Sequence, residues 1–295
     1  MLAAVHAAVH IPKGKVVVLT GSTGAIGQAI AAGVAGSNII APTVGLLILI
    51  VRNAASRARA DRLAKPLRGK ALRVDVVVAD LAQPAAVAEC AAQICAACSR
   101  VDVLIHCAAE VPPAREEVDG LERQFSTNAL SAFILMKGLR PSMPSGARVV
   151  LLADLKLAEG LEVSDLQSSR IGYEPSQAYA RTKQALRMLA AEAACGHGFD
   201  DLLVTCCHPG VVQSDLASAL GLASHATTDS TATAAKTPLF LALGPACKSG
   251  TFWGGNKQQL KDTLAEDADG RRALWEACEG LAAAACEQQQ AAASE

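Results

Sequence analysis

Glycines at positions 21, 24 and 27 could bring the backbone close to a phosphate group. They follow an apolar, β-branched run at 16–20 and precede good helix formers. Where a strand enters a glycine-rich turn that opens a helix, the unpaired N–H groups and the positive end of the helix dipole can hold a pyrophosphate. The spacing alone also suits a tight turn that only packs a helix on a sheet, so the rest of the chain must decide.

A second group of polar residues falls within stretches that are otherwise typical of helices. Tyr179 and Lys183 are four residues apart, which places a phenol and an ammonium on the same helix face. Asn128 lies in an apolar helical stretch, 126–136. A buried amide needs partners for its polar atoms, so Asn128 could be a structural bridge or could hold a water relay.

The elements that must position these residues alternate between strand and helix. Strands are predicted at 16–20, 46–51, 74–79, 101–105, 148–152, 202–206 and 250–254, and later helices at 237–243 and 273–285. This alternation predicts an α/β fold with a single doubly wound parallel sheet and helices on both faces. In such a sheet ligands bind at the carboxyl ends of the strands, so the residues that follow each strand are the candidate binding residues.

Two of these strand ends bear on the identity of a dinucleotide. Arg52 ends the second strand, where an adenosine ribose would lie, and an arginine there favours a 2′-phosphate over a free hydroxyl. With Arg57 and Arg59 nearby, the sequence predicts NADP(H), and a solvated loop charge is the alternative for Arg52. Asp80 could accept from the adenine amino group, cap a helix near Pro84, or do both.

Composition limits the classes of partner. The 295 residues carry a net charge of −1 and are 51% apolar, and no basic block is present, so nucleic acid and anionic membranes are not expected partners. The longest apolar stretch, 44–51, is far too short to span a membrane, which predicts a soluble protein. The ten cysteines are scattered and predict reduced thiols. Cys95 and Cys98 are expected to pack in the core, and no metal is expected.

The expected domain organisation is a Rossmann-type domain at 13–285, an N-terminal extension at 1–12 and a flexible tail at 286–295. Small and polar residues at 211–235 would form a mobile substrate loop, and 156–174 a flap. Residues 1–12 are too short and too neutral for a secretory signal. A cytoplasmic protein is expected, with a removed transit peptide to an organelle such as the chloroplast left open.

Together these stretches resemble the short-chain dehydrogenase/reductase family over nearly the whole chain, and most of all its retinol-dehydrogenase-like members. The matching motifs stand in family order: TGSTGAIG at 20–27, Arg52-Asn53, Asp80-Leu81, Asn128, Tyr179-x-x-x-Lys183, HPGVVQSDL at 208–216, and TPLFLALG at 237–244 with SGTFW at 249–253. The resemblance implies an NADP(H)-dependent oxidoreductase that interconverts an apolar alcohol and its aldehyde or ketone by hydride transfer. It also implies a homodimer or a larger assembly.

The resemblance assigns roles to individual residues. Tyr179 would be the general acid/base, and Lys183 would stabilise its phenolate and hold the nicotinamide ribose. Asn128 would position a water molecule, and Ser214 would contact the nicotinamide carboxamide or the phosphates of the cofactor. The implied cofactor-binding residues are Gly21, Ser22, Thr23, Gly24, Ile26, Gly27, Arg52, Asn53, Asp80, Leu81, Cys107, Ala108, Ala109, Tyr179, Lys183, Pro209, Gly210, Val212 and Ser214.

The chain departs from the family pattern at three places. Ala25 replaces the usual middle glycine, and His-Cys-Ala-Ala at 106–109 replaces Asn-Asn-Ala-Gly. The largest departure is Asp154, which falls where the family has its catalytic serine. An ionised carboxylate cannot donate to the substrate oxygen and raises the pKa of a neighbouring Tyr179, whereas a protonated one could donate.

These departures leave two alternatives open. Ser168 or Ser169 could supply the missing hydroxyl from the flap, which would preserve catalysis. Otherwise the chain could be a catalytically impaired NADP(H)-binding sensor, scaffold or assembly subunit.

Overall fold

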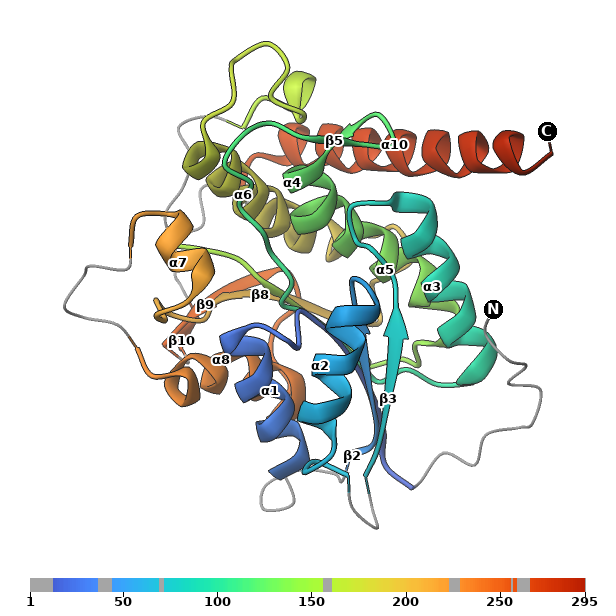
Figure 1. The fold of residues 1–295 in the computed structure, drawn as a ribbon, viewed down its shortest axis with the longest axis vertical. Helices are drawn as coiled ribbons and strands as arrows, with labels where there is room; N and C mark the ends of the chain where they lie inside the picture. Colours follow the sequence, from blue (N-terminus) through green and yellow to red (C-terminus); the bar gives the residue numbers. More distant parts are fainter. Residues whose placement is uncertain are drawn as a thin grey trace.

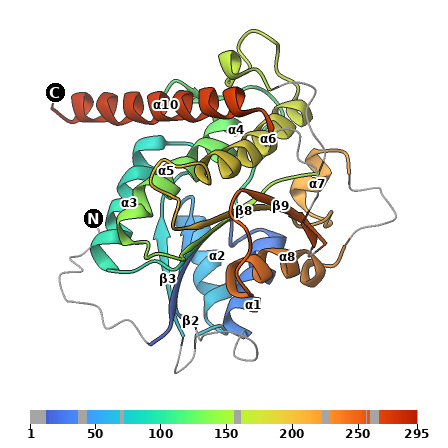
Figure 2. The same ribbon diagram turned by 180° about the vertical axis from the view of Figure 1, so that it is seen from behind.

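The computed structural model describes residues 13–36, 44–68, 72–155, 161–222, 229–255, 257–258 and 266–294. A central sheet runs through the molecule with helices on both faces (Figures 1 and 2). Its strand order is β10-β9-β8-β7-β4-β1-β2-β3. The parallel strands are β1 (Lys15–Thr20), β2 (Val44–Val51), β3 (Arg73–Val78), β4 (Val103–His106), β7 (Arg148–Leu152), β8 (Leu203–His208) and β9 (Thr251–Gly254), and β10 (Lys257–Gln258) is antiparallel to β9.

This topology confirms the predicted doubly wound sheet. The chain leaves β1 toward β3 on one side and returns to β4 on the other side of β1. The strand order therefore reverses between β1 and β4, which is the place where open α/β sheets bind their ligands.

Two apolar cores cover the two faces of the sheet. Val16 and Val18 of β1 belong to one core, and Val17 and Leu19 belong to the other. Successive side chains of a strand point to opposite faces, so a strand buried on both sides needs a continuous apolar run. One core includes residues of α3 (Pro84–Ala97), α5 (Ser131–Leu139), α6 (Pro175–Ala193) and α10 (Ala268–Ser294), and the other those of α1 (Ala25–Gly36), α2 (Ala54–Ala64) and α8 (Thr231–Leu243).

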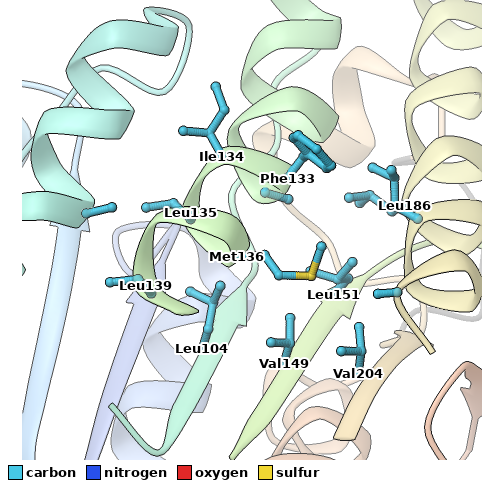
Figure 3. Packing of buried hydrophobic residues seen from close by; sticks show 14 of the residues in the cluster. Leu104, Phe133, Ile134, Leu135, Met136, Leu139, Val149, Leu151, Leu186 and Val204 are labelled. Carbon is cyan, nitrogen blue, oxygen red and sulfur yellow. The ribbon is translucent and has the colours of Figure 1, made fainter. Parts of the chain in front are cut away.

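Buried side chains of α5 belong to the larger core. Figure 3 shows Phe133, Met136 and Leu139 of this helix over the strand residues Leu104 and Val149, with side chains of α6 beside them. Burying side chains of this size stabilises the fold by about 1.5–3 kcal/mol each. The core therefore fixes α5 and α6 against the sheet, and these helices flank the candidate site.

Several element boundaries differ from the predicted ones. Strand β2 begins at Val44, two residues before its predicted start. The helix predicted at 273–285 extends as α10 to Ser294. The predicted loop 211–235 contains a short helix, α7 (Asp215–Ala219), and the first turn of α8, while 223–228 lie outside the described residues, as do 1–12.

The segment between β4 and α5 holds short elements, of which the sequence predicted only the helical stretch from 126 onward. They are the hairpin strands β5 (Glu117–Val118) and β6 (Leu121–Glu122), α4 (Arg123–Phe125), and a π-helical turn, η1 (Ser126–Leu130). The structure also describes two 3-10 turns: η2 (Arg140–Ser142) follows α5, and η3 (Val163–Asp165) lies between β7 and α6. None of the helices in the described ranges is long and apolar enough to cross a membrane.

Candidate active site

The glycine turn after β1 packs closely against the neighbouring strand end. Gly21 has a φ of +71°, and a Cβ there would lie 2.7 Å from the backbone N of Ala108. A Cβ on Gly27 would collide with the carbonyl oxygen of Gly21. The turn therefore needs glycine for packing, and it also leaves the first N–H groups of α1 without partners inside the helix.

A cavity of about 760 Å³ opens over this turn. Most of the predicted cofactor-binding residues line it, namely Gly21, Thr23, Gly24, Ile26, Gly27, Arg52, Asp80, Leu81, Cys107, Ala108, Ala109, Tyr179, Lys183, Pro209 and Ser214. The lining does not include Ser22, Asn53, Gly210 or Val212. Ser22 and Val212 are buried, Asn53 caps α2 by accepting from Ser56 N, and Gly210 packs against Asp229.

Tyr179 and Lys183 meet at one end of the cavity. The Lys183 side chain is buried, with 3% of its surface exposed, and its Nζ donates to the carbonyl oxygen of Leu152 at 2.8 Å. The same Nζ lies 5.4 Å from the centre of the Tyr179 ring. The i, i+4 spacing therefore places both groups as the sequence predicted.

The environment of this pair shifts both proton affinities. Burial lowers the pKa of Lys183 to about 8, although Cys107 and Asp154 act in the opposite direction. Burial also raises the pKa of Tyr179, and Asp154 and then Cys107 raise it further. At neutral pH the resting site therefore holds a neutral phenol beside a predominantly protonated amine.

Asn128 lies in η1, beneath the cavity wall rather than in it. Its Oδ1 accepts from Glu110 N at 2.8 Å, and its Nδ2 donates to Glu110 O at 3.0 Å and to Thr182 Oγ1 at 3.3 Å. These contacts are those of the structural bridge, which ties the loop after β4 to α6. The water relay that the family resemblance implies stays a prediction.

His106 replaces the asparagine that the family resemblance places at the end of β4. Its Nδ1 lies 3.2 Å from Thr20 Oγ1, which also accepts from the backbone N of Cys107 and of Ala108, at 3.1 Å each. Burial, with a further contribution from nearby Lys183, lowers the pKa of His106 to about 3, so the ring is neutral. The Thr20 hydroxyl thus joins the ends of β1 and β4 without the amide.

Asp154 lies two residues after β7, and His208 is the last residue of the neighbouring strand, β8. Asp154 Oδ1 lies 3.3 Å from His208 Nδ1, and the two side chains are 19% and 14% exposed. The carboxylate raises the pKa of both Tyr179 and Lys183, which is the effect on Tyr179 that the sequence predicted. Asp154 is therefore electrostatically coupled to the pair, although it does not line the cavity described above.

The two flap serines do not line the cavity either. The hydroxyl of Ser168 accepts from Arg181 Nη1 at 3.0 Å. The hydroxyl of Ser169 donates to Asp165 Oδ1 at 2.7 Å, and the Asp165 carboxylate also accepts from the backbone N of Ser169, Arg170 and Ile171. Asp165 therefore organises the described part of the predicted flap, while 156–160 lie outside the described residues.

The opposite end of the cavity carries charged side chains. Arg52 and Glu110 both line the cavity, and Arg52 Nη1 lies 3.0 Å from Glu110 Oε2. Asp80 Oδ1 accepts from Ala82 N at 3.0 Å, and α3 begins after Gln83, so the prediction that Asp80 caps this helix was wrong. The contact of Asp80 with an adenine stays a prediction.

Sequence reasoning missed some residues of the cavity wall, notably Ser56, Glu110, Val111, Thr127, Asp215, Leu216 and Ala219. Glu110 directly follows the 106–109 motif and Thr127 directly precedes Asn128, so adjacency to the motifs could have identified these two. Cys95 Sγ donates to Gly138 O and Cys98 is buried, as expected for packing residues. Within the described ranges, no group of three or more His, Cys, Asp or Glu side chains could hold a metal ion.

Known proteins resemble this chain over most of its length. Retinol dehydrogenase 14 of Mus musculus is 27% identical over 299 residues, covering 90% of this chain and 85% of its own. A Streptomyces sp. (strain C5) protein, provisionally assigned as daunorubicin C-13 ketoreductase DnrU, is 28% identical over 276 residues, covering 90% and 91%.

Solved structures share the fold. An uncharacterised protein from Mycobacterium paratuberculosis superposes with a TM-score of 0.72 at 25% identity, covering 91% of this chain and 93% of its own. A blue fluorescent protein from a metagenomic library, solved in complex with NADPH, has a TM-score of 0.64 at 23% identity and covers 81% and 95%. The family model described as short chain dehydrogenase matches residues 15–224. This match, with the sheet order and the cavity at its switch point, shows that the chain belongs to the short-chain dehydrogenase family of oxidoreductases.

Proposed function

We propose that this chain is an NADP(H)-dependent oxidoreductase that interconverts an apolar alcohol and its aldehyde or ketone. The observation that carries the proposal is that the Tyr179 phenol and the Lys183 ammonium share one cavity with the glycine turn of α1. The bound nicotinamide supplies or accepts the hydride. The residues of the chain bind the cofactor and substrate and move the accompanying proton.

The residues present fit a phosphorylated dinucleotide. A volume of about 760 Å³ lies within the ~300–1,000 Å³ usual for ligand sites. The N-terminus of α1 offers N–H groups to a pyrophosphate, and Gly24 leaves room above the turn because a Cβ there would meet only Gly21 O, at 3.4 Å. At the other end Arg52, Ser56 and Arg59 offer donors suited to a 2′-phosphate.

The protonation states support carbonyl reduction as the easier direction. A neutral Tyr179 can donate its proton to the oxygen of the substrate as negative charge develops there. The Lys183 ammonium, held by Leu152 O, then stabilises the phenolate that is left. For alcohol oxidation the phenol must first lose its proton, and both burial and Asp154 oppose that loss.

One observation favours a second candidate function, an NADP(H)-binding sensor, scaffold or assembly subunit with little turnover. Asp154 occupies the position that the family resemblance gives to the serine donor, and its carboxylate lies beside His208. A charged acceptor there would oppose the developing oxyanion instead of stabilising it.

The test separates cofactor binding from turnover. Calorimetry measures NADPH binding, and NADPH consumption is followed with a panel of retinoids, steroids and long-chain aldehydes. We expect Tyr179→Phe to bind NADPH but to lose turnover, whereas Tyr173→Phe, whose hydroxyl bonds Gln124 Oε1 outside the cavity lining, keeps it. Binding without turnover on any substrate would favour the second candidate, and no NADPH binding would refute both.

A further inference from the structure

Glu110 is the centre of a charged cluster on the cavity wall. Its Oε2 lies 3.0 Å from Arg52 Nη1, and its Oε1 lies 2.9 Å from Arg123 Nε. The Thr127 hydroxyl donates to the same Oε1 at 2.7 Å, and Asn128 holds both backbone polar atoms of Glu110. The carboxylate is thus fixed from several sides.

Arg52 is the more exposed partner of this ion pair. Its side chain is 51% exposed, against 20% for Glu110, and its Nη1 contacts the Glu110 carboxylate. Arg52 is also the guanidinium that the proposed function assigns to a 2′-phosphate. A guanidinium binds carboxylate and phosphate through the same N–H groups, so the two anions compete for it.

We propose that Glu110 sets the selectivity for the adenosine end of the cofactor. A 2′-phosphate must displace the Glu110 carboxylate from Arg52 and then lie near its negative charge, whereas a free 2′-hydroxyl leaves the ion pair intact. Glu110 therefore weakens the preference for the phosphorylated cofactor that Arg52 would give alone. This inference rests on the proposed function, because it requires a dinucleotide in the cavity.

The test uses nucleotide fragments, so that catalysis plays no part. Calorimetry measures the affinity of adenosine 2′,5′-bisphosphate and of adenosine 5′-monophosphate for the full chain. Glu110→Gln keeps an acceptor for Thr127 and removes the charge, and we expect it to tighten the bisphosphate about tenfold, or about 1.4 kcal/mol. The monophosphate is expected to change less than about twofold. Glu117→Gln, which removes the charge that pairs with Arg115 outside the cavity lining, should change neither.

A double-mutant cycle assigns the gain to Arg52. In an Arg52→Gln background the Glu110→Gln change should tighten the bisphosphate clearly less than in the wild type, because only the repulsion between the carboxylate and the phosphate is then relieved. Glu110→Asp, measured beside it, keeps the charge on a shorter side chain and should give an intermediate gain, so either folded variant decides the question. Unchanged or weaker bisphosphate binding would overturn the role of Glu110 alone. Failure of the wild type to bind either fragment would overturn the proposed cofactor as well.

Discussion

Replacing Asp154 with serine should increase the rate of carbonyl reduction. The carboxylate follows β7 beside His208 and raises the pKa of Tyr179, so it acts on the developing oxyanion as a negative charge. A serine hydroxyl at the same position would donate a hydrogen bond to that oxygen. The substitution therefore changes two things, the charge and the donor, and Asp154→Ala separates them because it removes only the charge.

The structure indicates which contribution is larger. Gaining one oriented donor to an oxyanion is worth about 10²–10³ in rate, or about 2.7–4 kcal/mol. The charge contributes less, because burial is the larger cause of the raised pKa of Tyr179. A one-unit change in that pKa corresponds to about 1.4 kcal/mol, so we expect Asp154→Ala to gain less than about tenfold.

The assay follows NADPH oxidation at saturating cofactor with one long-chain aldehyde for wild type, Asp154→Ser and Asp154→Ala. In the reverse direction the pH at which alcohol oxidation rises should fall in both variants, since the pKa of Tyr179 falls when the carboxylate is removed. Equal rates for the two variants would contradict the donor argument. A serine variant slower than wild type would show that Asp154 itself, in its protonated form, serves the reaction.

Further predictions concern the lysine, the glycine turn and the core. Burial lowers the pKa of Lys183 to about 8, so its charge is present below that pH and is lost above it. Carbonyl reduction should therefore fall as pH rises through about 8, and Lys183→Met should lose about 10²–10⁴ in kcat and flatten this pH profile. Gly27→Ala would drive a Cβ into Gly21 O and should cost about 1–3 kcal/mol in urea unfolding. Gly36→Ala, with open space at the end of α1, should cost nothing and could gain up to about 1 kcal/mol; equal losses would refute the packing argument. Trp275→Ala removes a fully buried indole from the core and should cost about 3–5 kcal/mol, while a loss below about 1 kcal/mol would mean that α10 contributes little to the fold.

The sequence predicted the sheet better than the ends of the helices. β7 lies at 148–152 as predicted, because a strand buried on both faces shows as an uninterrupted apolar run. α8 begins at Thr231, earlier than predicted, because its first turn of small residues carries little periodic signal and is fixed by the Ser230 side chain accepting from Thr233 N. α10 extends to Ser294 because alanine and glutamine are good helix formers, although they have no apolar pattern.

Side-chain contacts in the candidate site were predictable only where both residues lie within one element. Tyr179 and Lys183 share a helix face, so their spacing revealed them. The ion pair of Arg52 with Glu110 joins residues 58 apart in sequence, and no local pattern reports such a contact. The predicted helix cap at Asp80 was wrong because an acidic residue shortly before a helix resembles a cap in sequence. In the structure Asp80 accepts from Ala82 N, before the first amides of α3.

The Asn128 amide hydrogen-bonds two segments of the chain, the loop after β4 and helix α6. It bonds the backbone N–H and carbonyl of Glu110, and it donates to the hydroxyl of Thr182, the residue before Lys183. The buried Asn128 side chain thus connects Glu110, which pairs with Arg52, to α6, which carries Tyr179 and Lys183. A ligand that shifts the backbone at Glu110 would therefore also act, through Asn128, on the hydrogen bond to Thr182 of α6.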